Sequence, residues 1–292
     1  MGNRLKKPND QARLEKLGAT CSLEDIGKQT IDGKERFFQF CFEAMEESGS
    51  LGLEELLIKN KDKFLADVDF TCISDSYWLG TTKPCLTHGL RGICSFAVEV
   101  TGIQQDLHSG VFGGVVHEPL SDLIWVMSQL TSVENRILIP GEDDLTREKI
   151  HGSGEKTVIP SKVIGKFSIR IVPGMRPEKI ARGHLNQFLQ KLFRPQLGHD
   201  ALPWMADIND ENFRAGARAM KLVHNVDPDY IREGCSIPIT LTFQELTGKS
   251  VLLLPLGAAD DMAHSQNEKI NKVNYLQGVK TLLAYLLELG KV

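Results

Sequence analysis

Long apolar runs are missing from this sequence. No stretch reaches the ~18 consecutive apolar residues that a membrane-spanning helix needs. The first residues also lack the apolar core of a secretory signal, and Lys6 stands where a myristoylation signal requires Ser or Thr. We therefore expect a cytoplasmic protein with no membrane partner.

A surplus of positive charge is also absent. Lys and Arg number 34 against 38 Asp and Glu, which gives a formal net charge of -4. Because binding to a nucleic-acid backbone requires a basic surface, nucleic acid is not an expected partner. The six cysteines are scattered, without the close pairs of a zinc ribbon or the density of a disulfide scaffold. We interpret them as buried free thiols.

Histidine is absent before His88, so the first part of the chain offers carboxylates in place of imidazoles. Glu46 and Glu47 follow the aromatic run 37–42, and Asp75 follows the apolar run 68–73. If both runs are strands, these carboxylates lie just past strand ends, where open α/β sheets gather their ligands. The alternatives are a solvated Glu-Glu pair and an Asp that caps a turn.

The pattern of elements predicts an α/β protein of two domains, since 292 residues exceed the usual size of one domain. In the middle, strands and helices alternate as in a small α+β sandwich inserted into a larger domain. The final helix places Leu276, Val279, Leu283 and Leu286 on one face, a pattern typical of a core. The expected strands are 36–45, 68–73, 92–100, 163–172, 204–208, 237–243 and 251–254, and the expected helices are 53–64, 118–130, 177–193, 212–223 and 273–289.

Three further residues could carry chemistry. His264 lies beside Asp260 and Asp261, and a neighbouring carboxylate can orient a ligating imidazole. By residue type, Glu47, Asp75 and His264 could bind zinc, with Glu46 as the base. His108 lies in a glycine-rich segment and could be a turn residue, while Arg170 interrupts an apolar strand and either pairs with a carboxylate or faces solvent.

The quoted residues occur in a series of segments that together resemble one family. The chain is similar to the carnosinase and cytosolic non-specific dipeptidase family, relatives of aminoacylase and glutamate carboxypeptidase, from about Phe37 to the end. The segments are Met45-Glu46-Glu47-Ser48-Gly49-Ser50, Cys72-Ile73-Ser74-Asp75, Asp106-Leu107-His108-Ser109-Gly110, Phe167-Ser168-Ile169-Arg170, Arg232-Glu233-Gly234-Cys235-Ser236 and Asp260-Asp261-Met262-Ala263-His264-Ser265-Gln266-Asn267-Glu268.

The resemblance implies an architecture and a reaction. The architecture is a discontinuous α/β zinc-peptidase domain of the phosphorylase/hydrolase-like type, residues 1–86 and 212–292, with an inserted ferredoxin-like lid, residues 87–211, that also forms a homodimer. The reaction is metal-dependent hydrolysis of dipeptides by a water held between two zinc or manganese ions.

The resemblance also implies a role for each site residue. Glu46 would be the general base, Glu47 and His264 would bind one metal, and Asp75 would bind the other. His108 would polarise the scissile carbonyl, reaching in from the partner subunit. The substrate's carboxylate end would be held by Arg170, Ser236 and Thr157, and a guanidinium fork suits that task.

The chain departs from this family in its N-terminal part. The family's early His-x-Asp segment and the later aspartate that bridges both metals have no counterpart here, and the lid is shortened between Pro140 and Gly152. A catalytic zinc ordinarily has three protein ligands, so we expect impaired catalysis. The alternatives are a non-catalytic chain that pairs through its lid with full-length relatives, and an incomplete gene model or splice form.

Overall fold

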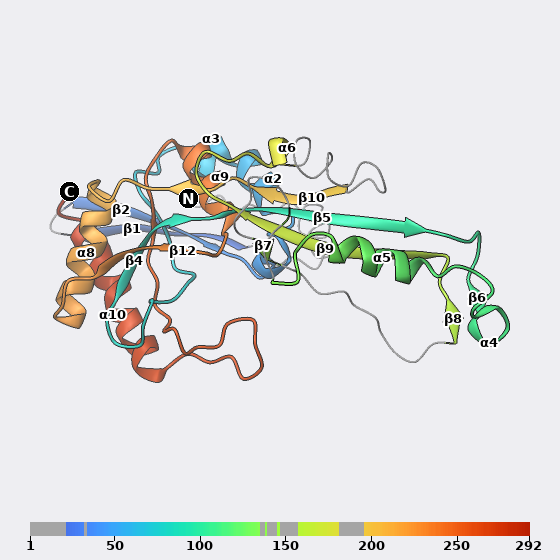
Figure 1. Cartoon of the computed structure of the whole chain (residues 1–292). Coiled ribbons are helices and arrows are strands. Elements are labelled where there is room, and N and C mark those ends of the chain that lie inside the picture. Colours follow the sequence, from blue (N-terminus) through green and yellow to red (C-terminus); the bar gives the residue numbers. More distant parts are fainter. Residues whose placement is uncertain (1–21, 32–33, 135–137, 139–144, 147–156, 181–195) are drawn as a thin grey trace. The chain divides into compact units, whose positions relative to one another are not determined.

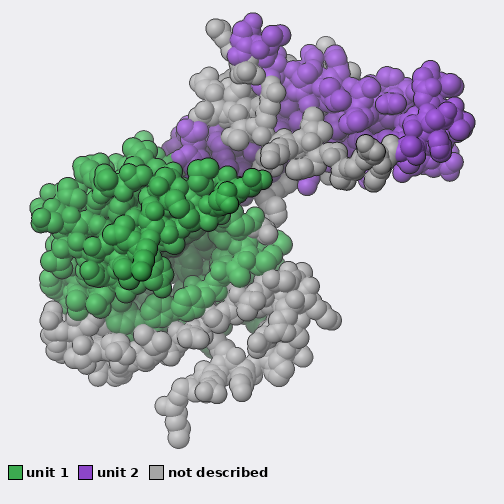
Figure 2. Space-filling view, turned by 90° about the horizontal axis from the view of Figure 1, so that it is seen from below, with its two compact units in different colours: residues 1–90, 205–233, 237–292 green, residues 91–204, 234–236 purple. Residues whose placement is uncertain are grey.

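The computed structural model describes residues 22–31, 34–134, 138, 145–146, 157–180 and 196–292 (Figure 1). The chain divides into two compact units (Figure 2). Unit 1 comprises residues 1–90, 205–233 and 237–292, and unit 2 comprises residues 91–204 and 234–236. The chain thus leaves unit 1, forms unit 2 and returns. The shortened segment 140–152 of the expected lid lies almost wholly outside the described residues.

A mixed sheet forms the centre of unit 1. β12 (Asp229–Glu233) runs parallel to β4 (Cys85–Leu90), and β13 (Val251–Leu253) runs parallel to β3 (Thr71–Ile73). β13 and β4 meet in an antiparallel bridge, which joins the two pairs into one sheet. The remaining strand, β11 (Trp204–Met205), pairs with β4 where the chain passes between the units. Because β3 and β13 are parallel, their carboxyl ends lie at the same edge.

Helices of unit 1 follow local signals in the sequence. α8 (Glu211–His224) begins where the Asp210 side chain accepts a hydrogen bond from the Phe213 N–H, which satisfies a backbone donor at the helix start. α2 (Leu53–Lys59) and α3 (Lys61–Phe64) replace the single helix expected at 53–64. α10 (Lys272–Leu289) corresponds to the expected final helix.

One helix was predicted as a strand. Residues 237–243, which are rich in Ile and Thr, belong to α9 (Pro238–Thr247). Pro238 occupies the first turn, where its missing N–H costs no helical hydrogen bond, and Gly248 ends the helix in the left-handed region at φ 66°. The start and stop signals outweigh the β-branched composition. The strand of this region is β12, which the sequence analysis did not predict.

Asn212 on α8 ties the sheet to two helices. Its side-chain amide donates to the carbonyl oxygens of Thr71 and Ser250, at 3.0 and 3.1 Å. Its side-chain oxygen accepts a hydrogen bond of 2.5 Å from the hydroxyl of Tyr285 on α10. Asn212 and Tyr285 are both buried, so this polar network is fully enclosed. It fixes the position of α8 and α10 against β3 and β13.

The prediction that the leucine face of α10 lies in the core is wrong for the described structure. Leu276, Val279 and Leu283 are 51%, 56% and 58% exposed, and Leu286 is only half-buried. The buried face instead carries small and polar residues, namely Asn274, Gly278, Thr281, Ala284, Tyr285 and Glu288. The helix packs through this face against α8. Hydrophobic periodicity shows that a face is apolar, but it does not show what is there to cover it.

A second expected core element is also exposed. The aromatic run lies in β2 (Lys34–Phe42), which pairs with β1 (Ser22–Ile31) in an antiparallel hairpin. Phe37 and Phe42 are 61% and 55% exposed, so the expectation of a buried strand at 36–45 is wrong. The hairpin forms a separate sheet among the described residues, and β3 therefore has no β2 neighbour there.

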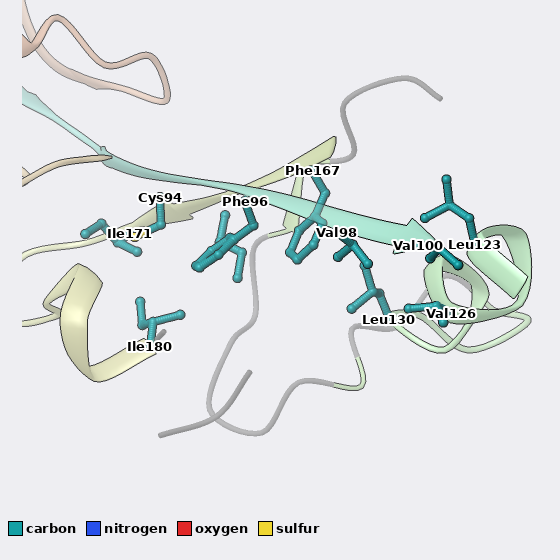
Figure 3. Packing of buried hydrophobic residues seen from close by; sticks show 11 residues of the cluster. Cys94, Phe96, Val98, Val100, Leu123, Val126, Leu130, Phe167, Ile171 and Ile180 are labelled. Carbon is teal, nitrogen blue, oxygen red and sulfur yellow. The ribbon is translucent and has the colours of Figure 1, made fainter. Parts of the chain in front are cut away.

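Unit 2 is built on a sheet of strand order β10-β5-β9-β7. β5 (Gly92–Thr101) and β9 (Lys162–Ile171) form its long antiparallel centre, flanked by β10 (Gln196–Ala201) and β7 (Leu145–Thr146). α5 (Pro119–Ser128) covers one face, where Leu123, Val126 and Phe167 join one apolar cluster (Figure 3). The expected helix 177–193 is described only at residues 177–180, where α6 covers Pro177–Lys179, and residues 181–193 lie outside the described residues.

Three small elements lie at one end of the long strands of unit 2 (Figure 1). β6 (Leu107–His108) pairs with β8 (Val158–Ile159), and α4 (Ser109–Phe112) follows β6 directly. In the described part of the chain, no helix is both long and apolar enough to cross a membrane.

Candidate functional site

The two adjacent glutamates sit in a tight turn after β2. Glu46 and Glu47 begin the 3-10 helix η1 (Glu46–Ser48), which ends at Gly49 in the left-handed region at φ 81°. The Gly49 N–H donates to the Glu46 carbonyl oxygen at 2.9 Å. A left-handed residue at this point favours glycine, because a side chain there would crowd its own backbone. The turn thereby places both glutamates on consecutive positions of one short helix.

Parallel strands bring Asp75 and the His264 loop to the same edge of the unit 1 sheet. Asp75 follows β3, and the chain that carries His264 follows β13. The Ser74 hydroxyl donates to the Leu254 carbonyl oxygen at 3.1 Å, which fastens the two strand ends together. Because both segments leave the sheet in the same direction, residues almost 190 positions apart become neighbours.

Glu47 and His264 are in direct contact. The Nε2 atom of His264 lies 2.9 Å from the Oε2 atom of Glu47, and both side chains are 70% exposed. Burial is the largest effect on Asp75 and raises its pKa above the ordinary value. Glu47 raises this pKa further and His264 lowers it, so Asp75 lies within the field of both residues. We call Glu46, Glu47, Asp75 and His264 the carboxylate cluster.

Glu46 is the most perturbed acid of the carboxylate cluster. Burial raises its pKa to about 7, and the negative charges of Asp75, Glu47 and Glu43 act in the same direction. The His264 charge lowers it, but by less. A carboxyl group with a pKa near neutrality can both take and return a proton at physiological pH, as a general base requires.

The metal ligands implied by the sequence are only partly assembled. Among the described residues, no group of three or more His, Cys, Asp or Glu side chains is arranged to hold a metal ion. Glu47 and His264 form a pair, whereas a catalytic zinc ordinarily has three protein ligands. The described residues therefore do not make a complete zinc site.

Asp260 and Asp261, two carboxylates close to His264 in the sequence, have contacts that differ from the expected ones. We expected Asp260 or Asp261 to orient the imidazole. Instead, the ammonium group of Lys269 lies 3.0 Å from Asp260 and 3.1 Å from Asp261. Lys269 was not among the residues predicted from sequence, and its only signal was a basic residue eight positions after the acidic pair at 260 and 261.

Arg170 and Ser236 meet in unit 2. The Arg170 guanidinium donates to the Ser236 hydroxyl oxygen at 2.8 Å, and this hydroxyl donates in turn to the Arg91 carbonyl oxygen at 2.6 Å. Within the part of the chain that the structure describes, Arg170 forms no ion pair with a carboxylate, and its side chain is half-buried. The hydroxyl directs the guanidinium and leaves further N–H donors for a ligand.

His108 and Thr157 are neighbours on the small β6–β8 ladder. The Ser109 N–H donates to the Thr157 carbonyl oxygen at 2.9 Å. The Nδ1 atom of His108 accepts a hydrogen bond of 3.0 Å from the Gly110 N–H. In the neutral ring the proton must then be on Nε2, so the exposed edge of His108 is a donor.

The two pairs of unit 2 are far apart. Val158 pairs with His108 just before β9 begins, and Arg170 lies near the end of β9. Eight residues of strand separate Lys162 from Arg170, which corresponds to roughly 26 Å at about 3.3 Å per residue. A dipeptide is at most about 7 Å long. Arg170 and His108 of one chain therefore cannot hold the same dipeptide.

The fold and the carboxylate cluster define a class of protein, and the sequence comparison identifies it. Residues 17–288 match peptidase family M20/M25/M40, and the chain belongs to this family of mixed α/β peptidases. The family assignment agrees with the resemblance to carnosinase-like dipeptidases drawn from the sequence.

Among curated relatives, the chain is similar to the Cys-Gly metallodipeptidase DUG1 of Candida albicans, at 43% identity over 86% of this chain and 64% of the relative. It is similar to the Beta-Ala-His dipeptidase of Mus musculus at 40% identity over 87% of this chain and 64% of the relative. The chain thus spans slightly less than two thirds of these relatives.

Solved structures show the same likeness. The dipeptidase Dug1p of Saccharomyces cerevisiae superimposes with a TM-score of 0.78 at 40% identity, over 87% of this chain and 66% of that one. Human carnosine dipeptidase 1 superimposes with a TM-score of 0.77 at 31% identity, over 97% and 90%. The match to the Candida albicans relative extends over 312 residues, which exceeds the 292 residues of this chain. Parts of that relative inside the matched region therefore have no counterpart here.

Proposed function

We propose that this chain is a metal-dependent dipeptidase whose catalysis is impaired by an incomplete set of metal ligands. The observation that carries the proposal is the carboxylate cluster, in which Glu47 contacts His264 and Glu46 has a pKa of about 7. Family membership and the names of the similar relatives support dipeptides as the substrate class.

Within this proposal, the residues of the carboxylate cluster divide two tasks. Glu46 takes a proton as the general base, which its raised pKa supports. Glu47 and His264 bind one metal ion and Asp75 contributes to a second, with zinc or manganese as the candidates. In such sites a bound metal lowers the pKa of water and polarises the substrate carbonyl.

Impairment follows from the number of ligands. The described residues supply a pair rather than a set of three, and similar relatives contain segments that this chain lacks. We propose that the lacking segments include the early histidine and the bridging aspartate, so the catalytic domain is truncated. A metal ion held by two exposed side chains exchanges readily with solvent, so occupancy and turnover should both be low.

Unit 2 is proposed to be a ferredoxin-like lid that also forms a homodimer. Its strands occur along the chain as β5, β7, β9 and β10, and the order β10-β5-β9-β7 is what a β-α-β-β-α-β arrangement produces. The separation of His108 from Arg170 supports the dimer. One dipeptide can meet an Arg170 and a His108 only if they come from different subunits.

A second candidate function is a non-catalytic partner of full-length relatives. It is favoured by the contrast between the units, because unit 2 retains the Arg170–Ser236 hydrogen bond and places His108 beside Thr157, while the described residues of unit 1 supply no third ligand. In such a heterodimer the chain would contribute His108 and Thr157 to the site of its relative. An incomplete gene model or splice form remains the third alternative.

Metal content and hydrolysis, measured on the same sample, distinguish these functions. Freshly purified chain is analysed by plasma mass spectrometry, and hydrolysis of Cys-Gly and β-Ala-His is followed with added zinc or manganese. Substoichiometric metal with slow turnover is the expected result, and Glu46→Gln should abolish the turnover. Two tightly bound ions with the turnover of complete relatives would contradict the proposed impairment. No turnover by a folded dimer would favour the non-catalytic partner.

A further inference from the structure

His264 lies on an exposed loop that is closed at its base. The loop comprises residues 262–268, and at its base the Lys269 N–H donates to the Asp261 carbonyl oxygen at 3.0 Å. The Lys269 ammonium group adds ion pairs to Asp261 at 3.1 Å and to Asp260 at 3.0 Å. Backbone and side-chain contacts thus join the same two positions, which fixes the distance between the two ends of the loop.

Asp261 is the buried anchor of this base. Its side chain is only 8% exposed, and its Oδ2 atom accepts a hydrogen bond of 2.8 Å from the Ala258 N–H. The other carboxylate oxygen faces Lys269. A Cβ atom on Gly257 would lie 2.8 Å from Oδ2, so this close approach requires glycine. Asp261 is therefore held on one side by the backbone and on the other by Lys269.

The loop has little support of its own. Within residues 262–268 the structure describes one backbone hydrogen bond, from the Ser265 N–H to the Met262 carbonyl oxygen at 3.0 Å. Met262, His264 and Asn267 all adopt left-handed conformations, with φ near 60°. Such conformations are disfavoured for residues with side chains and persist only where the surroundings impose them. The base is the part of the structure that can impose them.

The contact of His264 with Glu47 cannot take over this task. Both side chains are 70% exposed, and such an exposed polar contact contributes little because water competes for both groups. If the base opened, the loop would relax toward ordinary backbone conformations, and the imidazole would leave Glu47. The position of His264 therefore depends on contacts that lie outside the carboxylate cluster.

We propose that Lys269 and Asp261 form a clamp that positions the His264 imidazole against Glu47. They are positioning residues, since neither is part of the carboxylate cluster. The inference rests on the proposed function, in which His264 and Glu47 bind one metal ion together. It assigns to Lys269 the task of keeping these two side chains in contact. Outer contacts of this kind commonly decide the orientation of a ligating imidazole.

The test compares Lys269→Met with a matched control in the full chain. Lys291→Met is the control, because Lys291 also pairs with a buried carboxylate, that of Glu288, at the far end of α10. The imidazole resonances of His264 are recorded at fixed pH, with Glu47→Gln as the reference for a lost contact. We expect Lys269→Met to shift them in the same direction as Glu47→Gln, with no further shift in the double variant.

Two further readouts complete the test. Amide hydrogen exchange within 262–268 should be several-fold faster in Lys269→Met and unchanged in Lys291→Met, and Lys269→Arg should restore both signals. Wild-type resonances and exchange in Lys269→Met would overturn the proposal. If Lys269→Met does not fold, Lys269→Gln gives the same comparison with a smaller change. If Lys269→Met shows the resonance shift and the faster exchange while the unmodified chain has no dipeptidase activity, the clamp is supported and the proposed function is contradicted.

Discussion

The position of Glu46 lowers the stability of the folded protein whenever its carboxyl group is charged. Its carboxyl group is half-buried and faces three other acids, and each of these conditions favours the protonated form. A carboxyl group on the surface would avoid the cost. Structures retain such groups where a proton has to be transferred near neutral pH.

Stability should therefore depend on pH through Glu46. Because the folded-state pKa is raised from 4.5 to about 7, the folded protein binds the proton more tightly than the unfolded chain. The contribution of Glu46 to the free energy of unfolding is fully present below pH 4.5 and is lost as pH rises through 7. We expect Glu46→Gln to raise the urea midpoint relative to wild type at pH 8 and to have little effect at pH 4.

The control for this prediction is Glu54→Gln, at an exposed position of α2. At pH 8 its effect on the urea midpoint should be much smaller than that of Glu46→Gln. A Glu46→Gln effect that did not grow between pH 4 and pH 8 would show that Glu46 is not desolvated in the folded protein.

The residues of the carboxylate cluster could be singled out from the sequence, but their contacts could not, and their roles stay a prediction. An acid that follows an apolar strand can be found by inspection, as Glu46, Glu47 and Asp75 were. The 2.9 Å contact between Glu47 and His264 joins the turn after β2 to a loop that follows β13, and no local pattern specifies that these segments meet. Lys269 was missed because its role depends on the burial of Asp261.

At the scale of elements, the Asn212–Tyr285 hydrogen bond joins two helices to the sheet. Tyr285→Phe removes the donor and leaves the buried Asn212 oxygen without it, so we expect a loss of about 1–3 kcal/mol in the free energy of unfolding. Tyr275→Phe, on the exposed side of the same helix, should change it by less than about 0.5 kcal/mol. Equal effects of both changes in urea unfolding would contradict the network.

The leucine face of α10 provides a second prediction for an element. Leu283→Gln should cost less than about 0.5 kcal/mol, because the side chain is 58% exposed. Leu253→Ala in the fully buried β13 should cost about 2–5 kcal/mol. A cost for Leu283→Gln in this second range would show that another part of the chain or a second molecule covers the face.

Elements were predicted best where the pattern and the surroundings agree. Two expected strands, 92–100 and 163–172, correspond to β5 and β9 within a few residues. Two expected helices, 118–130 and 212–223, correspond to α5 and α8 equally well. The exposure of β2 and α10 was not predictable, because a repeating apolar pattern assumes that the covering elements are present. The error at α9 arose because Ile and Thr composition was given more weight than Pro238 and Gly248.

At the scale of the whole molecule, the proposed dimer makes a prediction about mixing. His108→Ala and Arg170→Ala chains should each be nearly inactive, since each removes one group from every site. Mixed and refolded together, they form heterodimers with one intact site, so about a quarter of all sites should recover. Activity of the mixture equal to the mean of the separate variants would contradict a site shared between subunits.

Chain length and the change of pattern near Pro84 predict two domains, and the chain divides into two compact units, while the expected domain bounds stay a prediction. The return of residues 234–236 to unit 2, where Ser236 contacts Arg91 and Arg170, could not be predicted. Sequence distance gives no indication of such a return.

The uncovered leucines of α10 also determine how the isolated chain behaves in solution. Sulfate and similar salts strengthen the tendency of apolar surface to leave water. The chain should therefore be retained strongly on phenyl resin and should salt out early, and polar residues at 276, 279 and 283 should reverse both properties. Purification behaviour would then report how much apolar surface this protein leaves uncovered.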